Sequence, residues 1–316
     1  MTTPTPSAAP LASARTRAMP IILLLVGGAM FGFTYVLYKA AADHRIPVFA
    51  FVFWQTLIAG GFIYVLCLVR RQPMRFDGRH VRVYLILGVL GIGIPHGVMF
   101  FVAHHLPAGI MGLNVTIEPV VTYLLALLLA LEKLRALRVL GLIFALAGVL
   151  CILLPEASLP SREMVLWVLL AFVAPTAFAV QNVLAERYWP AESTTWHLTG
   201  GMMLGAAVFT FPFMVVLDEW WFFEGSMDPG DWALLGTVAI NVFGMWMFLE
   251  LIRTAGAVFA ATITYLETLT AVGWGMALLS ERHSGWIWAA IALLFIGLAL
   301  IHRSGRKAVT RHHAAP

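Results

Sequence analysis

The chain contains ten apolar segments, each about as long as a helix that crosses a lipid bilayer. Such a helix needs about 20 mostly apolar residues to span ~30 Å of hydrocarbon. A closed β-barrel would need short segments of alternating polarity, and these runs are continuous. The sequence therefore predicts an all-α polytopic membrane protein with ten transmembrane helices. The segments cover residues 19–41, 46–69, 83–103, 107–131, 136–154, 164–187, 196–217, 232–252, 257–280 and 284–301.

The composition agrees with this class. Of the 316 residues, 61% are hydrophobic and 11% are charged, and a soluble chain of this length could not bury so much apolar surface. The net charge of +4 arises from basic residues in the loops between apolar runs, so it does not indicate binding to nucleic acid. Both cysteines, Cys67 and Cys151, lie inside apolar segments, which argues against a disulfide framework.

The positions of Lys and Arg predict the orientation, because cytoplasmic loops carry an excess of these residues. With the N-terminus inside, 16 of the 20 basic residues fall on the inner side, and the acidic loop 218–231 falls outside. We therefore expect both termini to be cytoplasmic and the chain to lie in the plasma membrane, the inner membrane in a bacterium. The four basic residues on the outer side are Lys39, Arg45, Arg162 and Arg282.

Two pairs of glutamates share one spacing. Glu118 and Glu267 lie near the middle of their apolar segments, Glu132 and Glu281 close the same segments, and each pair is 149 residues apart. This spacing predicts two halves of five helices, and an odd number per half inverts one half relative to the other, an arrangement that supports alternating access. The expected parts are a disordered tail at 1–18, a first repeat at 19–154, a second repeat at 164–301 and a basic cytoplasmic tail at 302–316.

Four blocks carry a resemblance to a known family. They are FGFTYVLYK at 31–39, PAGIMGLNVTIEPVVTYLLALLLALEKL at 107–134, AGVLCILL at 147–154 and TYLETLTAVGWGMALLSE at 264–281. These blocks resemble the two repeats of the drug/metabolite transporter superfamily, in its EamA-like branch. The chain departs from the family at 130–132 and 279–281, where the family commonly has Leu-Gly-Glu. The resemblance implies ten helices, an inverted five-plus-five repeat and transport of small metabolites or drugs, often outward.

A carboxylate in the middle of a membrane segment is costly and is by default a candidate functional group. Lys and Arg do not occur at the depth of Glu118 and Glu267 in any segment. We therefore expect each acid to be protonated, hydrogen-bonded to a neighbour or neutralised by a cationic ligand. The alternative for each is a neutral glutamate that only packs helices together. At the helix ends, Glu132 and Glu281 are expected to form local ion pairs with adjacent basic residues.

Other polar and aromatic side chains extend the candidate site. Asn114 lies on the same helical face as Glu118, and Tyr35 and Asn182 occupy matching positions 147 residues apart. Tryptophans in the middle of segments could line an aromatic pocket for a cation, with packing against lipid as the alternative. No catalytic residue, metal site or cofactor is predicted. The candidate substrate-binding or proton-coupling residues are Glu118, Glu267, Asn114, Tyr35, Trp54, His96, Asn182, Asn241, Trp246 and Tyr265.

Three pairs of glycines lie four residues apart and predict close helix contacts. They are Gly28 and Gly32, Gly93 and Gly97, and Gly201 and Gly205.

These features favour a secondary active transporter of small metabolites that works by alternating access. Phosphorylated substrates would lack a positive partner in the membrane, whereas two acids and aromatic side chains suit cationic, zwitterionic or neutral molecules. We predict efflux of amino acids or of amine or aromatic metabolites, with proton coupling through Glu118 or Glu267. The alternative is an uptake permease for a small cationic or zwitterionic metabolite.

Other classes of function fit less well. A membrane-embedded enzyme would need a constellation of acids, histidines or nucleophiles near one interface, and His104 and His105 are the only hint of one. A channel would need a repeated ring or filter, which one chain with two halves does not obviously provide. The sequence contains no Walker motif, so it does not indicate transport driven by ATP. The sequence leaves the oligomeric state open, and a homodimer is one option.

Overall fold

The computed structural model describes residues 10–153, 164–223, 225–282 and 285–312, and all regular elements within these ranges are helical. The first half contains α1 (Pro10–Asp43), α2 (Val48–Val69), α3 (Gly78–Gly88), η1 (Val89–Gly93), α4 (Ile94–Val102), α5 (Ala108–Asn114), η2 (Val115–Ile117), α6 (Glu118–Leu128) and α7 (Ala136–Leu153). The second half contains α8 (Met164–Ala171), α9 (Val173–Tyr188), α10 (Thr195–Val216), α11 (Pro229–Ala255), α12 (Ala257–Ala260), α13 (Ile263–Leu278) and α14 (Gly285–His312).

Eight stretches of the described chain are long and apolar enough to cross a membrane. The remaining two predicted segments, 136–154 and 284–301, correspond to α7 and α14, whose apolar stretches, Ala136–Gly148 and Gly285–Gly297, are shorter. The count of ten membrane helices therefore stays a prediction. The eight spans are Met19–Asp43, Val48–Val69, Gly78–Val102, Ala108–Leu128, Met164–Tyr188, Thr195–Val216, Pro229–Ala255 and Ala257–Leu278.

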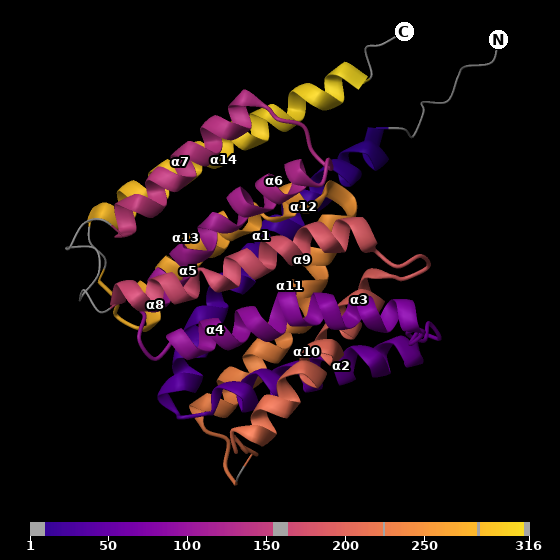
Figure 1. Cartoon of the computed structure of the whole chain (residues 1–316), viewed down its shortest axis with the longest axis vertical. Coiled ribbons are helices and arrows are strands. Elements are labelled where there is room, and N and C mark those ends of the chain that lie inside the picture. Colours follow the sequence, from indigo (N-terminus) through magenta and orange to yellow (C-terminus); the bar gives the residue numbers. More distant parts are fainter. Residues whose placement is uncertain (1–9, 154–163, 224, 283–284, 313–316) are drawn as a thin grey trace, which may run out of the picture.

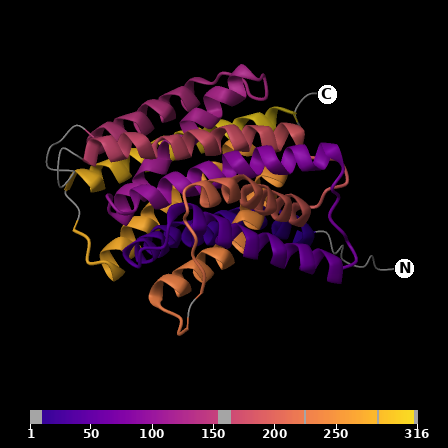
Figure 2. The ribbon, with the colours of Figure 1, turned by 60° about the horizontal axis from the view of Figure 1, so that its bottom comes forward.

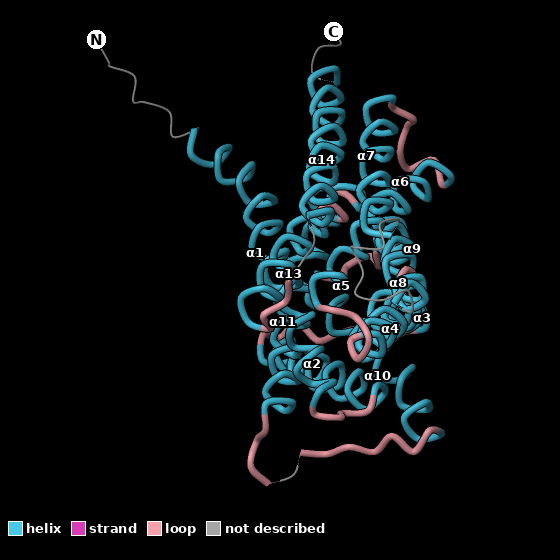
Figure 3. The backbone as a smooth tube through the Cα atoms, turned by 90° about the vertical axis from the view of Figure 1, so that its left-hand side faces the viewer, coloured by secondary structure: helices cyan, strands magenta, loops and turns pink. Residues whose placement is uncertain are grey.

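The ends of the chain differ from expectation. We predicted a disordered tail through residue 18, but α1 begins at Pro10, while residues 1–9 lie outside the described ranges. At the other end, α14 continues to His312, through most of the stretch expected to be a basic tail. The start of α1 and the end of α14 lie at the same end of the bundle (Figures 1 and 3).

Four of the spans are interrupted, two of them near their middle and two nearer their start. A π-helical turn separates α3 from α4, a 3-10 turn separates α5 from α6, and short breaks separate α8 from α9 and α12 from α13. After each of the first three breaks, the next helix has a proline in its first turn, where a missing backbone N–H is tolerated. These prolines are Pro95 in α4, Pro119 in α6 and Pro175 in α9. Irregular backbone at membrane depth is tolerated where it is buried in protein or lines a cavity. The breaks therefore mark the interior of the bundle as the place for a site.

The helices pack in pairs that join the two halves of the chain. α7 packs against α14 at one edge of the molecule, and α2 packs against α10 at the opposite edge (Figure 1). Between these edges, α1 packs against α11 and α13, while α9 packs against α4 and α6. Turned by 60°, the same helices form a bundle with one shared long direction (Figure 2). The centre of this bundle is thus built by both halves.

Glycine allows the closest of these contacts. A Cβ added to Gly32 of α1 would lie 2.5 Å from the carbonyl oxygen of Glu267, and one added to Gly28 would lie 2.8 Å from Leu266 Cβ. The predicted close contacts are confirmed there, because α1 could not approach α13 so closely with larger residues. The prediction for Gly97 is wrong, since a Cβ at that position would meet nothing within 4 Å.

Candidate functional site

A cavity of ≈ 50 Å³ lies among α1, α4, α6, α9, α11 and α13, so both halves of the chain contribute to its wall. A single water needs about 10–15 Å³ measured in this way, so the cavity holds a few water molecules. Sites for drug-sized ligands occupy roughly 300–1,000 Å³, which is well above the present volume. Its polar lining consists of Thr34, Tyr35, Tyr38, His96, Glu118, Asn241, Thr264 and Glu267.

The two mid-membrane acids both line this cavity, and each is held by a residue of the other half. Tyr35 of α1 donates its hydroxyl to Glu267 Oε1 at 2.5 Å. Asn182 of α9 donates its amide to Glu118 Oε1 at 2.6 Å. Glu118 is 3% exposed and Glu267 is 9% exposed, so neither carboxyl group reaches bulk water. The two hydrogen bonds form a crossed pair between the halves.

A second polar network reaches the cavity from α11 and α2. Asn241 Nδ2 donates to Gln55 Oε1 at 3.0 Å, and Gln55 Nε2 contacts His96 Nδ1 at 3.4 Å. An amide nitrogen can only donate, so Nδ1 of the imidazole is the acceptor and Nε2 carries the ring proton. The network therefore fixes the His96 ring in one orientation beside the two acids.

The match to known proteins identifies the family. The model of the EamA-like transporter family matches the chain twice, over residues 18–154 and 165–303. The chain belongs to the EamA-like transporter family. It is thus an integral membrane transporter, as the predicted resemblance to the drug/metabolite transporter superfamily implied.

Individual relatives agree with the family. The transporter is 24% identical over 299 residues to the uncharacterized transporter YvbV of Bacillus subtilis (strain 168), covering 92% of this chain and 93% of that protein. It is 22% identical over 219 residues to protein PecM of Dickeya dadantii (strain 3937), covering 68% and 72% of the two chains. A crystal structure with 22% sequence identity aligns with a TM-score of 0.60 over 90% of this chain and 97% of that chain, which supports the fold.

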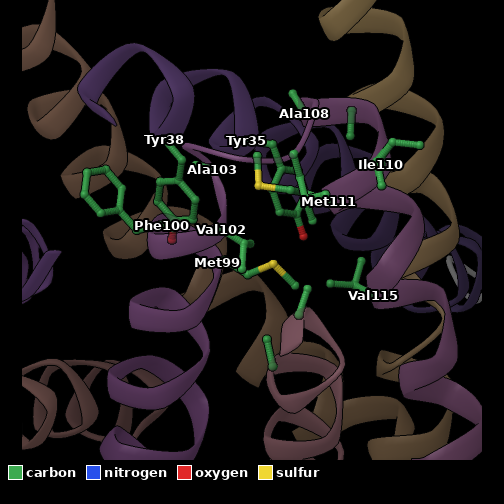
Figure 4. Packing of buried hydrophobic residues seen from close by; sticks show 14 of the residues in the cluster. Tyr35, Tyr38, Met99, Phe100, Val102, Ala103, Ala108, Ile110, Met111 and Val115 are labelled. Carbon is green, nitrogen blue, oxygen red and sulfur yellow. The ribbon is translucent and has the colours of Figure 1, made fainter. Parts of the chain in front are cut away.

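Aromatic side chains contact one another on two sides of the transporter's cavity. Toward the loop that follows α1, Tyr38 meets Phe51 and Phe100 edge-on, and the latter two rings stack at 4.1 Å. The rings of Tyr38 and Phe100 lie beside each other in the apolar cluster that also contains Tyr35 (Figure 4). On the other side of the cavity, Phe31 meets Phe248 edge-on at 6.2 Å. Aromatic contacts therefore flank the cavity on both sides in this conformation.

Five of the ten predicted site residues line the cavity: Tyr35, His96, Glu118, Asn241 and Glu267. Asn182 lies behind this lining and holds Glu118. The other four make contacts elsewhere. Asn114 donates to the carbonyl of Val168 at 2.9 Å, and Tyr265 is buried in the core.

The two predicted tryptophans do not form an aromatic pocket. Trp54 donates to the carbonyl of Trp221 at 2.8 Å, so it attaches the loop between α10 and α11 to α2. Trp246 stacks on Trp196 of α10 with ring centres 5.1 Å apart. Both indoles serve packing outside the cavity, and the aromatic lining comes from tyrosine and phenylalanine instead.

The residues that the sequence did not single out for the site are mostly apolar. Thr34, Tyr38, Met99, Phe178 and Phe248 line the cavity, and none carries a signal that separates it from other membrane residues. Gln55 is different, because a fully buried amide within a membrane segment must find a partner. That rule points to a network around Gln55, although it does not name His96 and Asn241 as its members.

The acids at the helix ends make contacts between segments. Glu281 accepts hydrogen bonds from the backbone N–H groups of Ala108 and Gly109, at 2.7 and 3.0 Å, so it caps the start of α5. Glu132 pairs with Arg138 at 2.7 Å. The expected ion pair of Glu132 with the adjacent lysine is therefore wrong, since its partner is Arg138. The chain turns after α6 and brings the start of α7 back to this carboxylate.

Within the described residues, His, Cys, Asp and Glu form no group of three that could hold a metal ion. The chemistry available in the cavity is hydrogen bonding, charge neutralisation by two carboxyl groups and contact with aromatic faces. These are the means by which a transporter binds a small molecule reversibly.

Proposed function

We propose that the protein is a proton-coupled secondary transporter that moves small cationic, zwitterionic or neutral metabolites by alternating access. The observation that carries this proposal is the crossed pair of carboxyl groups at one cavity. Glu118 and Glu267 come from opposite halves, and each is hydrogen-bonded to a residue of the other half. Movement of the halves must therefore change the partners of both acids together.

The pattern of helix contacts supports an inverted repeat of five helices in each half. If α1 corresponds to α9, then the contacts of α1 with α11 and α13 correspond to those of α9 with α4 and α6. The pairs α7 with α14 and α2 with α10 relate equivalent helices to each other. The family model also matches once in each half. We propose ten membrane helices with both termini in the cytoplasm, as the Lys and Arg distribution predicts.

Proton coupling would follow from exchange of hydrogen-bond partners at the acids. A carboxyl group released by Tyr35 or Asn182 can take up a proton or bind a cationic substrate group, but not both at once. If the cavity then opens to the other side of the membrane, the proton or substrate leaves there. Competition of this kind couples the two fluxes without any further component.

The lining of the cavity limits the class of substrate. Its described residues include two acids and several aromatic rings but no Lys or Arg. An ammonium group can pair with a carboxylate and lie over an aromatic ring, which gains about 0.5–2 kcal/mol. A phosphate would enter a site without a positive partner and next to two acids. We therefore propose amino acids and amine or aromatic metabolites as substrates.

The present cavity is too small for such a substrate, so binding requires the helices around it to separate. The aromatic contacts on its two sides, Tyr38 with Phe100 and Phe31 with Phe248, are the places where it would open. We propose outward transport across the plasma membrane, in keeping with the resemblance to drug and metabolite exporters. An uptake permease is the alternative, and the same cavity would serve it.

Transport into proteoliposomes tests the proposal. We expect saturable flux of a labelled amino acid or amine, and no flux or competition by a sugar phosphate. Trp246→Phe, which alters an aromatic residue outside the cavity, should retain the flux, whereas Asn241→Leu should reduce it. Saturable uptake of a sugar phosphate, or the absence of flux for every amino acid and amine in the panel, would contradict the proposed substrate class.

A further inference from the structure

A second and much larger hollow lies between α3 and α9. This groove has a volume of ≈ 590 Å³, which falls within the range of about 300–1,000 Å³ typical of small-molecule sites. It shares no lining residue with the central cavity. Its wall consists of Gly78, Arg79, Arg82, Val83, Ile86 and Leu87 of α3, with Leu184 and Tyr188 of α9.

The groove is polar at the membrane surface and apolar below it. The span Gly78–Val102 begins and the span Met164–Tyr188 ends at this groove, so these two helix ends lie at the same end of the bundle. Arg79 and Arg82 lie in the first turns of α3, three residues apart, and both are exposed. Further along the helix, Val83, Ile86 and Leu87 continue the wall toward the interior of the bilayer.

The two guanidinium groups of the groove are available for a ligand. Within the described part of the chain, Arg79 and Arg82 have no acidic side chain as partner. The nearest acid in sequence, Asp77, is engaged, because it accepts from the backbone N–H groups of Arg79 and His80 and contacts the His80 ring at 2.6 Å. By contrast, Arg75 on the neighbouring loop is paired with Glu192.

We propose that this groove binds an anionic phospholipid from the leaflet on the arginine-rich side of the membrane. The lipid phosphate would lie between Arg79 and Arg82, whose planar guanidinium groups suit bidentate binding of phosphate. One acyl chain would run along Val83, Ile86 and Leu184, and Tyr188 would lie at the level of the headgroup, where tyrosine is enriched. Basic pockets between membrane helices are known to take such lipids.

Native mass spectrometry of the purified full-length transporter, titrated with phosphatidylglycerol or with phosphatidylcholine of the same acyl chains, tests this site. We expect one phosphatidylglycerol to bind more tightly than phosphatidylcholine. Loss of both charges in Arg79→Gln/Arg82→Gln should weaken phosphatidylglycerol binding about 30-fold and phosphatidylcholine binding much less, because the choline cation offsets the charge of its phosphate. The control Arg70→Gln/Arg71→Gln removes two charges from the neighbouring loop and should alter binding less than about twofold.

Two further measurements separate a lipid site from a site for free phosphate and from a loss of folding. Ile86→Trp fills the apolar part of the groove and should weaken binding of both lipids, whereas inorganic phosphate should not displace phosphatidylglycerol. If Arg79→Gln/Arg82→Gln lowers the unfolding temperature, the titration is made with Arg79→Lys/Arg82→Lys instead. That variant keeps both positive charges and should retain the preference for phosphatidylglycerol. Equal binding of the two lipids to the unaltered protein, equal loss in the control, or displacement by inorganic phosphate would overturn the proposal.

Discussion

The hydrogen bond between Tyr35 and Glu267 offers a quantitative test of how the two halves are joined. Tyr35→Phe removes one hydroxyl and leaves the ring in place, while Glu267→Met removes the acceptor and keeps a side chain of similar length. Combining the two changes gives a double-mutant cycle, which isolates the energy of the pair from the separate effects of each substitution. The cycle requires only the unfolding free energies of four proteins.

The geometry sets the expected magnitude. The two oxygens are 2.5 Å apart, and the residues are 4% and 9% exposed, so bulk water has little access to the bond. A net contribution of about 0.5–1.5 kcal/mol is usual for a neutral pair and about 1.5–3 kcal/mol for a charged one. Double-mutant cycles on hydrogen bonds between membrane helices give coupling energies of about 0.6 kcal/mol on average and about 1.7 kcal/mol at most. These energies are small because the groups also find partners in the unfolded state within the membrane. We expect a coupling of about 1–2 kcal/mol.

Unfolding in mixed micelles with increasing amounts of denaturing detergent provides the measurement. The equivalent cycle for Asn182→Leu and Glu118→Met should give a similar coupling, since that hydrogen bond is 2.6 Å long and equally buried. Tyr35→Phe combined with Asn114→Leu is the matched control, because Asn114 bonds to Val168 instead, and these two changes should be additive within about 0.3 kcal/mol. A coupling below about 0.3 kcal/mol in both test cycles would refute the crossed pair.

Three more predictions concern particular positions. Gly32→Ala should lower the unfolding free energy by about 1–3 kcal/mol through overpacking against α13, whereas Gly97→Ala, in open space, should not; equal losses would contradict the contact. In a cysteine-free background, Ser226→Cys should react with an impermeant reagent from outside and Arg75→Cys should not, and the reverse pattern would overturn the topology. The hydrogen bonds from His80, with that from its backbone N–H as the largest cause, lower the pKa of Asp77. The stability that the ionised Asp77 adds is therefore present above the ordinary Asp pKa and is lost as the pH falls through the lowered pKa. Asp77→Ala should lower the unfolding temperature more at about pH 7 than at about pH 2, and an equal loss at both would contradict this.

Part of the site could be predicted from the sequence because charge is rare in a membrane. Glu118 and Glu267 stand out in apolar segments, and the cost of burying a carboxylate predicts that each is protonated, hydrogen-bonded or neutralised by a ligand. The spacing of 149 residues also predicts that they occupy corresponding positions of two halves. In the structure both acids lie in the wall of one cavity.

The rest could not be predicted because membrane helices are apolar on every side. In a soluble helix the apolar stripe marks the buried face, but here Phe31 and Phe248 face the cavity while Phe62 is 53% exposed on α2, with no difference in residue type. Trp54 is a further example, since its partner is a loop carbonyl 167 residues away. Such contacts depend on tertiary packing that residue spacing does not encode.

We propose that Glu118 and Glu267 couple protons to substrate, and replacement of each acid by glutamine tests this coupling. Glutamine keeps the shape and much of the hydrogen bonding but cannot titrate. The measurement is substrate flux against an imposed pH gradient in proteoliposomes, for Glu118→Gln and Glu267→Gln, with the unfolding temperature as a check on folding. We predict that both variants fold normally and that the pH dependence of transport is lost, most completely in Glu118→Gln, where the 3-10 turn before α6 interrupts the helix beside the acid. Wild-type rates with a wild-type pH response in both variants would contradict the account and leave the acids as packing residues.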